Sequence, residues 1–192
     1  LSTPQEIERT LVESGAKVVV TLSLFYNAVA GAAAKTGAPR IVVTSIKEYL
    51  PLHRRILFTL FREAKEKHRV DIRTDPNAVW FQSIINSQLP TPPHVDAQPA
   101  DLAVIQYTTG TTDAPKGAML THANLVANAM QLRHWYVDAQ EGRERVLSVL
   151  PFSHSYGMTA CMNLAAFLGA AMILLPTFNT KEVLETIRRE KP

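Results

Sequence analysis

A short stretch of the chain, residues 107–117, carries the residue types that bind a polyphosphate. It runs Tyr107, Thr108, Thr109, Gly110, Thr111, Thr112, Asp113, Ala114, Pro115, Lys116 and Gly117. Glycine lets the backbone approach an anion closely, hydroxyl groups donate to its oxygens, and the ammonium of Lys116 supplies a positive charge. A Walker A loop needs Gly-Lys-Ser/Thr, but Pro115 and Gly117 flank this lysine, so a P-loop NTPase is excluded. The stretch, called the phosphate loop below, predicts a nucleotide site of another kind.

A second candidate stretch, residues 151–157, reads Pro-Phe-Ser-His-Ser-Tyr-Gly and contains His154. It follows residues 145–150, which predict a strand, and the phosphate loop likewise follows an apolar run at residues 102–105. Ligands of open α/β sheets bind at the carboxyl ends of strands. Both stretches fall at such ends, which favours a ligand site there.

The phosphate loop resembles the signature of the adenylate-forming superfamily, usually written Tyr-Thr-Ser-Gly-Thr-Thr-Gly-x-Pro-Lys-Gly. Residues 151–157 are similar to the Pro-x-x-His-x-x-Gly segment that follows this signature in acyl-CoA synthetases. Two positions differ. Thr109 replaces serine and keeps the hydroxyl, whereas Asp113 replaces glycine and brings a carboxylate close to the phosphates. Nearly the whole chain resembles the large N-terminal domain, most closely that of bacterial or archaeal long-chain fatty-acid-CoA ligases.

The resemblance implies an enzyme that joins ATP to a fatty acid, releases pyrophosphate, and transfers the acyl group from acyl-AMP to CoA, with Mg²⁺ on the phosphates. In that interpretation Lys116 and His154 are the catalytic residues, and Thr108 reaches the metal. His154 would touch the carboxylate or line the entrance of the acyl pocket. The phosphate-binding residues would be Thr108, Thr109, Gly110, Thr111, Thr112, Lys116 and Gly117.

Two other functions stay open. The superfamily also activates aromatic and amino acids, and the residues that line its acid pocket mostly lie beyond Pro192. A non-catalytic relative that binds a nucleotide or lipid is the other alternative, and Asp113 is the only residue that favours it.

Hydrophobic periodicity predicts an α/β fold with a mixed, largely parallel sheet flanked by helices. Thr3-Pro4-Gln5-Glu6 is a capping box, and Gly15 should end the helix that follows it. A strand at residues 17–22, a helix at 24–35 and a strand at 41–43 form a parallel βαβ unit. A helix at 78–85 comes next. Later elements are a helix capped by Thr121, the strand at 145–150, a buried helix at 158–168, a strand at 169–175 and a helix capped by Thr180.

The resemblance also predicts the domain organisation. Residues 1–192 would form part of an AMP-binding N-terminal domain, with a helical excursion at about 45–99 that ends in the proline-rich connector 89–99. The C-terminal domain, with the catalytic lysine of the superfamily, would lie outside the chain. We therefore expect a fragment that does not complete the two-step reaction alone.

One segment of that excursion, residues 51–70, holds the excess positive charge. Six basic and two acidic residues give it a net charge of +4, while the whole chain totals +3. Ile56, Leu57, Leu60 and Phe61 fall at helical spacing. The segment is either a surface helix packed on the domain or a peripheral contact with a membrane or another anionic partner. Nucleic acid is not expected, because no aromatic-interleaved basic groove accompanies the charge.

Composition favours a globular, cytoplasmic protein. Hydrophobic residues make up 46% of the chain, enough for a sizeable core, and no uncharged apolar stretch of about 20 residues is present. The single cysteine, Cys161, excludes an internal disulfide and fits a reducing compartment.

Overall fold

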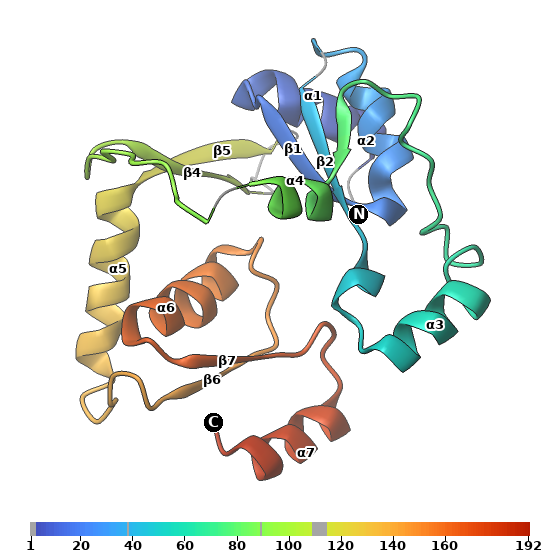
Figure 1. Cartoon of the computed structure of the whole chain (residues 1–192). Coiled ribbons are helices and arrows are strands. Elements are labelled where there is room, and N and C mark those ends of the chain that lie inside the picture. The colour runs from blue at the N-terminus through green and yellow to red at the C-terminus, as the bar shows by residue number, and fades with distance from the viewer. Residues whose placement is uncertain (1–2, 38, 89, 109–114) are drawn as a thin grey trace. The chain divides into compact units, whose positions relative to one another are not determined.

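The computed structural model describes residues 3–37, 39–88, 90–108 and 115–192. The chain forms two compact units, Leu1–Pro93 and His94–Pro192, which are described one at a time below (Figure 1). Their border lies inside the predicted proline-rich connector, whose residues 91–98 have no helix or strand.

The first unit contains a three-stranded parallel sheet. Strands β1 (Val18–Leu22), β2 (Arg40–Thr44) and β3 (Ala78–Trp80) pair in that order (Figure 1). The β-branched residues of β1 and β2 suit a pleated, half-buried surface, and the predicted parallel pairing of these two strands is confirmed. The 3₁₀ helix η1 (Ser23–Phe25) and helix α2 (Tyr26–Ala33) connect them.

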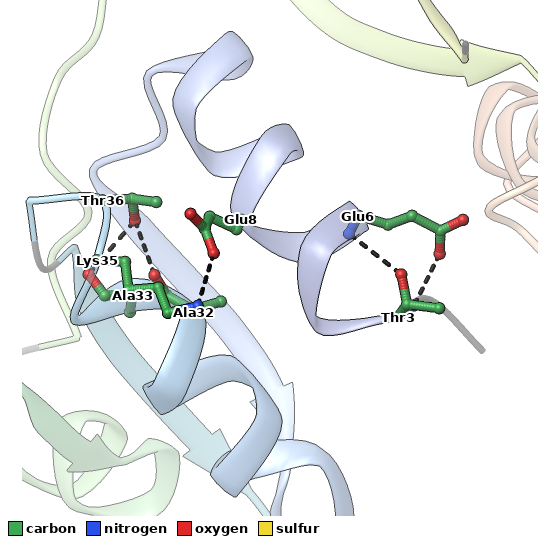
Figure 2. A network of polar contacts seen from close by, with 7 residues as sticks. All are labelled: Thr3, Glu6, Glu8, Ala32, Ala33, Lys35 and Thr36. Atoms are coloured by element: carbon green, nitrogen blue, oxygen red, sulfur yellow. Dashed lines mark hydrogen bonds and ion pairs between the residues drawn. The ribbon is translucent and has the colours of Figure 1, made fainter. Parts of the chain in front are cut away.

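Helix α1 (Pro4–Ser14) begins and ends where its local signals predict. The backbone N–H of Thr3 donates to Glu6 Oε2 at 2.7 Å, and the N–H of Glu6 donates to Thr3 Oγ1 at 3.3 Å (Figure 2). Gly15 ends the helix in the left-handed conformation, with φ of 60°. An ion pair between Lys35 and Glu8 at 3.1 Å joins α1 to the end of α2 (Figure 2). The core of the unit comprises Leu11, Tyr26, Val29, Ala32, Ala33, Ile41, Val43 and Ile72.

The segment between β2 and the connector holds the 3₁₀ helix η2 (Ile46–Tyr49), helix α3 (Leu52–Phe61) and helix α4 (Phe81–Ser87). The helix predicted from Ala78 is wrong at its start, because residues 78–80 form β3. Ala78 and Trp80 pack against the core, and pairing with β2 satisfies their backbone groups. An apolar run this short cannot be assigned to a helix or a strand by periodicity alone.

The second unit contains two pairs of strands (Figure 1). Strands β4 (Leu102–Thr108) and β5 (Lys116–Thr121) form an antiparallel hairpin, and β6 (Arg145–Ser148) pairs with β7 (Ala171–Leu174) in parallel. Strand β5 was not predicted. With β1, β2 and β3, the described strands give the expected mixed and largely parallel α/β architecture.

Four helices accompany these strands in the described part of the second unit. Helix α5 (His122–Trp135) begins at the predicted cap, because Thr121 Oγ1 accepts the N–H of Asn124 at 3.2 Å. The predicted helix at 158–168 is a π-helix, η3 (Gly157–Asn163), continued by α6 (Leu164–Leu168). Helix α7 (Thr180–Glu190) is capped by Asn179 rather than by Thr180. Among the described residues, no helix has the length and apolar character needed to cross a bilayer.

Candidate functional site

The phosphate loop connects the two strands of the β4–β5 hairpin. Thr108 ends β4 and Lys116 begins β5, and the two residues are partners in the antiparallel register. The Thr108 hydroxyl donates to the Lys116 carbonyl oxygen at 3.4 Å. The predicted site residues Thr109, Gly110, Thr111 and Thr112, together with Asp113 and Ala114, lie outside the described residues. Paired strands therefore fix the two ends of the predicted phosphate site.

Lys116 and Gly117 have different roles at this end of the hairpin. Lys116 is exposed, and no carboxylate in the described parts of the chain pairs with its ammonium. A Cβ atom on Gly117 would come to 2.7 Å from Ile105 Cγ2 and 3.5 Å from the ring of Tyr107. Glycine at 117 therefore lets β5 lie close to the side chains of β4, while the ammonium next to it stays available to an anion.

His154 lies in a turn that orients its imidazole. The His154 N–H donates to the Pro151 carbonyl at 3.0 Å, and the N–H of Tyr156 donates to His154 Nδ1 at 3.2 Å. Since Nδ1 accepts a hydrogen bond, the neutral ring carries its proton on Nε2. The residue is exposed. This arrangement offers one fixed donor, Nε2–H, to a ligand oxygen.

Gly157 closes the same turn. A Cβ atom at this position would lie 2.2 Å from the Pro151 carbonyl oxygen and 2.9 Å from its carbonyl carbon. Both are backbone atoms, so no side-chain rotation can relieve the contact. The glycine of the predicted Pro-x-x-His-x-x-Gly pattern thus lets the start of η3 pack directly on Pro151.

Gln106 connects the hairpin to the His154 turn. Its Nε2 donates to the carbonyl oxygen of Ser153 at 2.6 Å, across 47 positions of sequence. Gln106 lies two residues before Thr108, and Ser153 immediately precedes His154. The structure therefore joins two of the stretches that were singled out from sequence. Gln106 itself was missed, and its only sequence signal is an amide directly after the apolar run at residues 102–105.

A groove of about 330 Å³ lies at the carboxyl ends of β6 and β7. It is lined by Ser148, Val149, Leu150, Pro151, Phe152, Leu174, Leu175 and Pro176. The lining is mainly apolar and includes the first residues of the His154 turn. Such a groove suits an apolar ligand whose polar end reaches the turn.

The described residues hold no group of three or more His, Cys, Asp or Glu side chains that could bind a metal ion. The two titrating groups with the largest pKa shifts belong to the first unit. Burial and a hydrogen bond to Asp75 raise the pKa of Tyr26 to about 12, and hydrogen bonds from Arg73 lower the pKa of Asp71 to about 2. Tyr26 and Asp71 each pair with a residue of the first unit, whereas Thr108, Lys116 and His154 belong to the second.

Comparison with known proteins identifies the family of the chain. Residues 1–192 match the family model described as AMP-binding enzyme. The chain is 40% identical, over its whole length, to a long-chain-fatty-acid-CoA ligase of Bacillus subtilis, of which it covers 34%. It spans about a third of the length of the curated relatives that it matches.

Two solved structures have the same fold. The whole chain superposes on 32% of a long-chain-fatty-acid-CoA ligase from Archaeoglobus fulgidus, with a TM-score of 0.71 and 25% identity. ATP-bound MatB from Rhodopseudomonas palustris gives a TM-score of 0.72 at 24% identity, covering 98% of this chain and 31% of that one. The family match over all residues, the 40% identical relative and the fold agree, and the chain belongs to the AMP-binding enzyme family.

Proposed function

We propose that the protein activates a long-chain fatty acid with ATP and transfers the acyl group to CoA. The observation that carries the proposal is the hairpin, which holds Thr108 opposite the exposed Lys116 and is hydrogen-bonded through Gln106 to the His154 turn. The name of the 40% identical relative supports the substrate class.

In the first step a carboxylate oxygen of the fatty acid attacks the α-phosphorus of ATP. The bond from that phosphorus to the bridging oxygen breaks, and pyrophosphate leaves with the electron pair. Lys116 offsets the negative charge that develops on the leaving group, and the hydroxyl groups of Thr109, Thr111 and Thr112, with N–H groups of the phosphate loop, donate to its oxygens. No general base is needed, because a carboxylic acid is already ionised near neutral pH.

His154 orients the acid. Its Nε2–H donates to the fatty-acid carboxylate, and the neighbouring groove at the ends of β6 and β7 receives the first part of the acyl chain. In the second step the CoA thiol loses its proton and its sulfur attacks the acyl carbon, and the bond from that carbon to the phosphate oxygen breaks as AMP leaves. No residue described here is assigned to that step.

Thr108 is the residue that would hold Mg²⁺. Mg²⁺ keeps several waters and needs few protein oxygens when substrate phosphates bind it. The lone pairs of the exposed Thr108 hydroxyl fit that requirement, since its hydrogen is directed to Lys116. When bound, the ion would neutralise phosphate charge.

The proposal extends to organisation and location. Residues 1–192 form part of the AMP-binding domain, and the segment at about 45–99 is an excursion from it. The protein is cytoplasmic, does not bind nucleic acid, and touches membranes peripherally through residues 51–70.

The test is acid-dependent ATP–pyrophosphate exchange by the longest natural polypeptide that contains these residues, with fatty, aromatic and amino acids. We expect exchange with long-chain fatty acids and a loss of at least about 100-fold in Lys116→Gln, the scale of one lost transition-state donor. Lys181→Gln, an exposed lysine on α7, is the matched control and should be unchanged.

The other outcomes separate the alternatives. Exchange only with aromatic or amino acids would contradict the fatty-acid assignment. ATP binding without exchange for any acid would favour a non-catalytic relative. In that case, a large gain in ATP affinity in Asp113→Gly would identify the aspartate as the cause of a weakened nucleotide site, and unchanged affinity would show that the aspartate is tolerated.

A further inference from the structure

Helix α3 turns its apolar side chains toward solvent. Leu52, Leu60 and Phe61 are 73%, 69% and 69% exposed, and Ile56 and Leu57 are about half exposed. At about 100° per residue, Leu52, Ile56 and Leu60 fall on one stripe of the helix, with Leu57 and Phe61 beside it. Figure 1 shows α3 apart from the sheet and from helices α1 and α2 of the same unit. Of the two alternatives for residues 51–70, these exposures disfavour a helix that packs its apolar stripe on its own unit.

The opposite side of α3 is firmly attached. Phe58 is buried, and its ring meets the ring of His68 edge-on, with centroids 5.4 Å apart. His68 Nδ1 lies 3.3 Å from the hydroxyl of Ser23, which is buried at the end of β1. Just after the helix, Glu63 forms an ion pair with Lys47 of η2. Because the inner side is anchored, the outward direction of the apolar stripe is a fixed property of the unit.

Arginines flank the apolar stripe. Arg54 follows Phe61 around the helix, and Arg55 and Arg62 lie on the other side, between Thr59 and the buried Phe58. All three are exposed, and neither Arg54 nor Arg55 has an ion pair among the described residues. A hollow of about 480 Å³, lined in part by Ile46, Leu50 and Phe61, extends the apolar surface toward η2.

Charge distinguishes this surface from other exposed apolar groups. Trp135 and Val137, at the end of α5, are 84% and 77% exposed, but residues 133–144 around them have two basic and three acidic residues. Residues 51–70, by contrast, combine outward apolar side chains with a net charge of +4. A partner must therefore be apolar inside and anionic at its surface, which describes a bilayer of anionic phospholipids.

We propose that the outward face of α3 docks on an anionic phospholipid bilayer. Leu52, Ile56 and Leu60 enter the boundary between headgroups and acyl chains, while Arg54 and Arg55 meet lipid phosphates at the rim. The inference deepens the membrane contact proposed above and needs neither nucleotide nor catalysis. Docking would hold the unit beside the phase in which long-chain fatty acids dissolve.

Vesicle co-sedimentation of the full chain, without ATP or fatty acid, tests the inference. Vesicles contain phosphatidylcholine alone or with about one third phosphatidylglycerol. We expect binding to the anionic vesicles only, weakened by salt. Arg54→Gln with Arg55→Gln should lower the binding constant about 25-fold, since each basic residue near such a surface contributes about five-fold.

The apolar contact needs its own variant. Leu60→Ser should lower binding about 10-fold, the effect of one buried leucine. Its matched control is Val12→Ser on α1 of the same unit, where the valine is 65% exposed. Lys17→Gln with Arg40→Gln is the charge control in the same unit. Both controls should bind like the wild type, and circular dichroism should be unchanged throughout, because every substituted side chain is exposed.

Three results would overturn the inference. The first is equal binding to neutral and anionic vesicles, and the second is a control that weakens binding as much as its matched variant. The third is concentration-dependent dimerisation that Leu60→Ser abolishes while no vesicles bind, which would make the face a protein interface. The vesicle measurements need no ATP and no fatty acid, so their outcome is independent of the pyrophosphate-exchange assay. Failure of one test would leave the other unaffected.

Discussion

Gly157→Ala should disrupt the His154 turn because the added methyl group has no space. Real Cβ atoms essentially never lie within 3.0 Å of another heavy atom, yet this one would lie 2.2 Å from the Pro151 carbonyl oxygen. That oxygen would have to retreat by about 0.8 Å, and the Leu150 oxygen at 3.2 Å restricts the movement. Overpacking of this kind costs about 1–3 kcal/mol, and the backbone position of the obstacle favours the upper end.

Urea unfolding of Gly157→Ala, followed by far-ultraviolet circular dichroism, measures the loss of stability. With a slope of about 1–3 kcal/mol per molar, a loss of about 3 kcal/mol moves the midpoint of the second unit down by about 1–3 M. Gly31→Ala is the matched control: Gly31 lies in α2 with nothing within 4 Å of its added Cβ. That variant should be more stable by about 0.5–1 kcal/mol. A Gly157→Ala protein as stable as the wild type, with its turn intact, would refute the reasoning.

Three further predictions concern the anchors of the first unit and the phosphate loop. Phe58→Ala should destabilise the first unit by about 3 kcal/mol in urea unfolding, whereas Phe61→Ala should change stability by less than about 0.5 kcal/mol; equal effects would contradict the burial difference. The pKa of Tyr26 is raised to about 12 by burial and by its bond to Asp75, so the neutral phenol stabilises the unit fully below pH 10 and this contribution is lost between pH 10 and 12. The free energy of unfolding of Tyr26→Phe should be about 1 kcal/mol lower than that of the wild type at pH 8 and should fall less between pH 10 and 12. An identical fall in both proteins would exclude Tyr26 as its cause. Lys116→Gln should weaken ATP binding about 10-fold in calorimetric titration at low salt, as expected for a charge-assisted contact; unchanged affinity would exclude the lysine from the phosphate site.

Local signals explain which elements were predicted from sequence. The capping box at Thr3 and the left-handed Gly15 specify α1 without any tertiary contact. β-Branched residues specify β1 and β2. Strand β5 was missed because Lys116, Gly117 and Ala118 are poor strand formers, and only the pairing with β4 makes them a strand. Asn179 and Thr180 can both cap a helix, so the sequence leaves the cap of α7 undecided.

The individual site residues were predicted from the sequence, but the contact that joins the two stretches holding them was not. Thr108, Lys116 and His154 were identified from their resemblance to family motifs. The Gln106 to Ser153 bond was not predictable, because it depends on how β4 packs beside a turn 47 residues later. The direction of α3 was left open for a related reason. An apolar stripe marks one face of a helix, but the anchor of that helix, Phe58 on His68, belongs to tertiary structure.

Because η3 is a π-helix, the orientation of the His154 imidazole depends on the number of residues in η3. The Leu164 N–H reaches back five residues to the Thr159 carbonyl, one more than in an α-helix. Deleting a single residue between them would restore α-helical spacing and rotate everything before it by about 100° relative to α6. The imidazole would then point elsewhere although every motif residue was kept. For chains of this kind, a one-residue gap at residues 160–163 of an alignment would therefore indicate a differently oriented imidazole, even though residues 151–157 are all present.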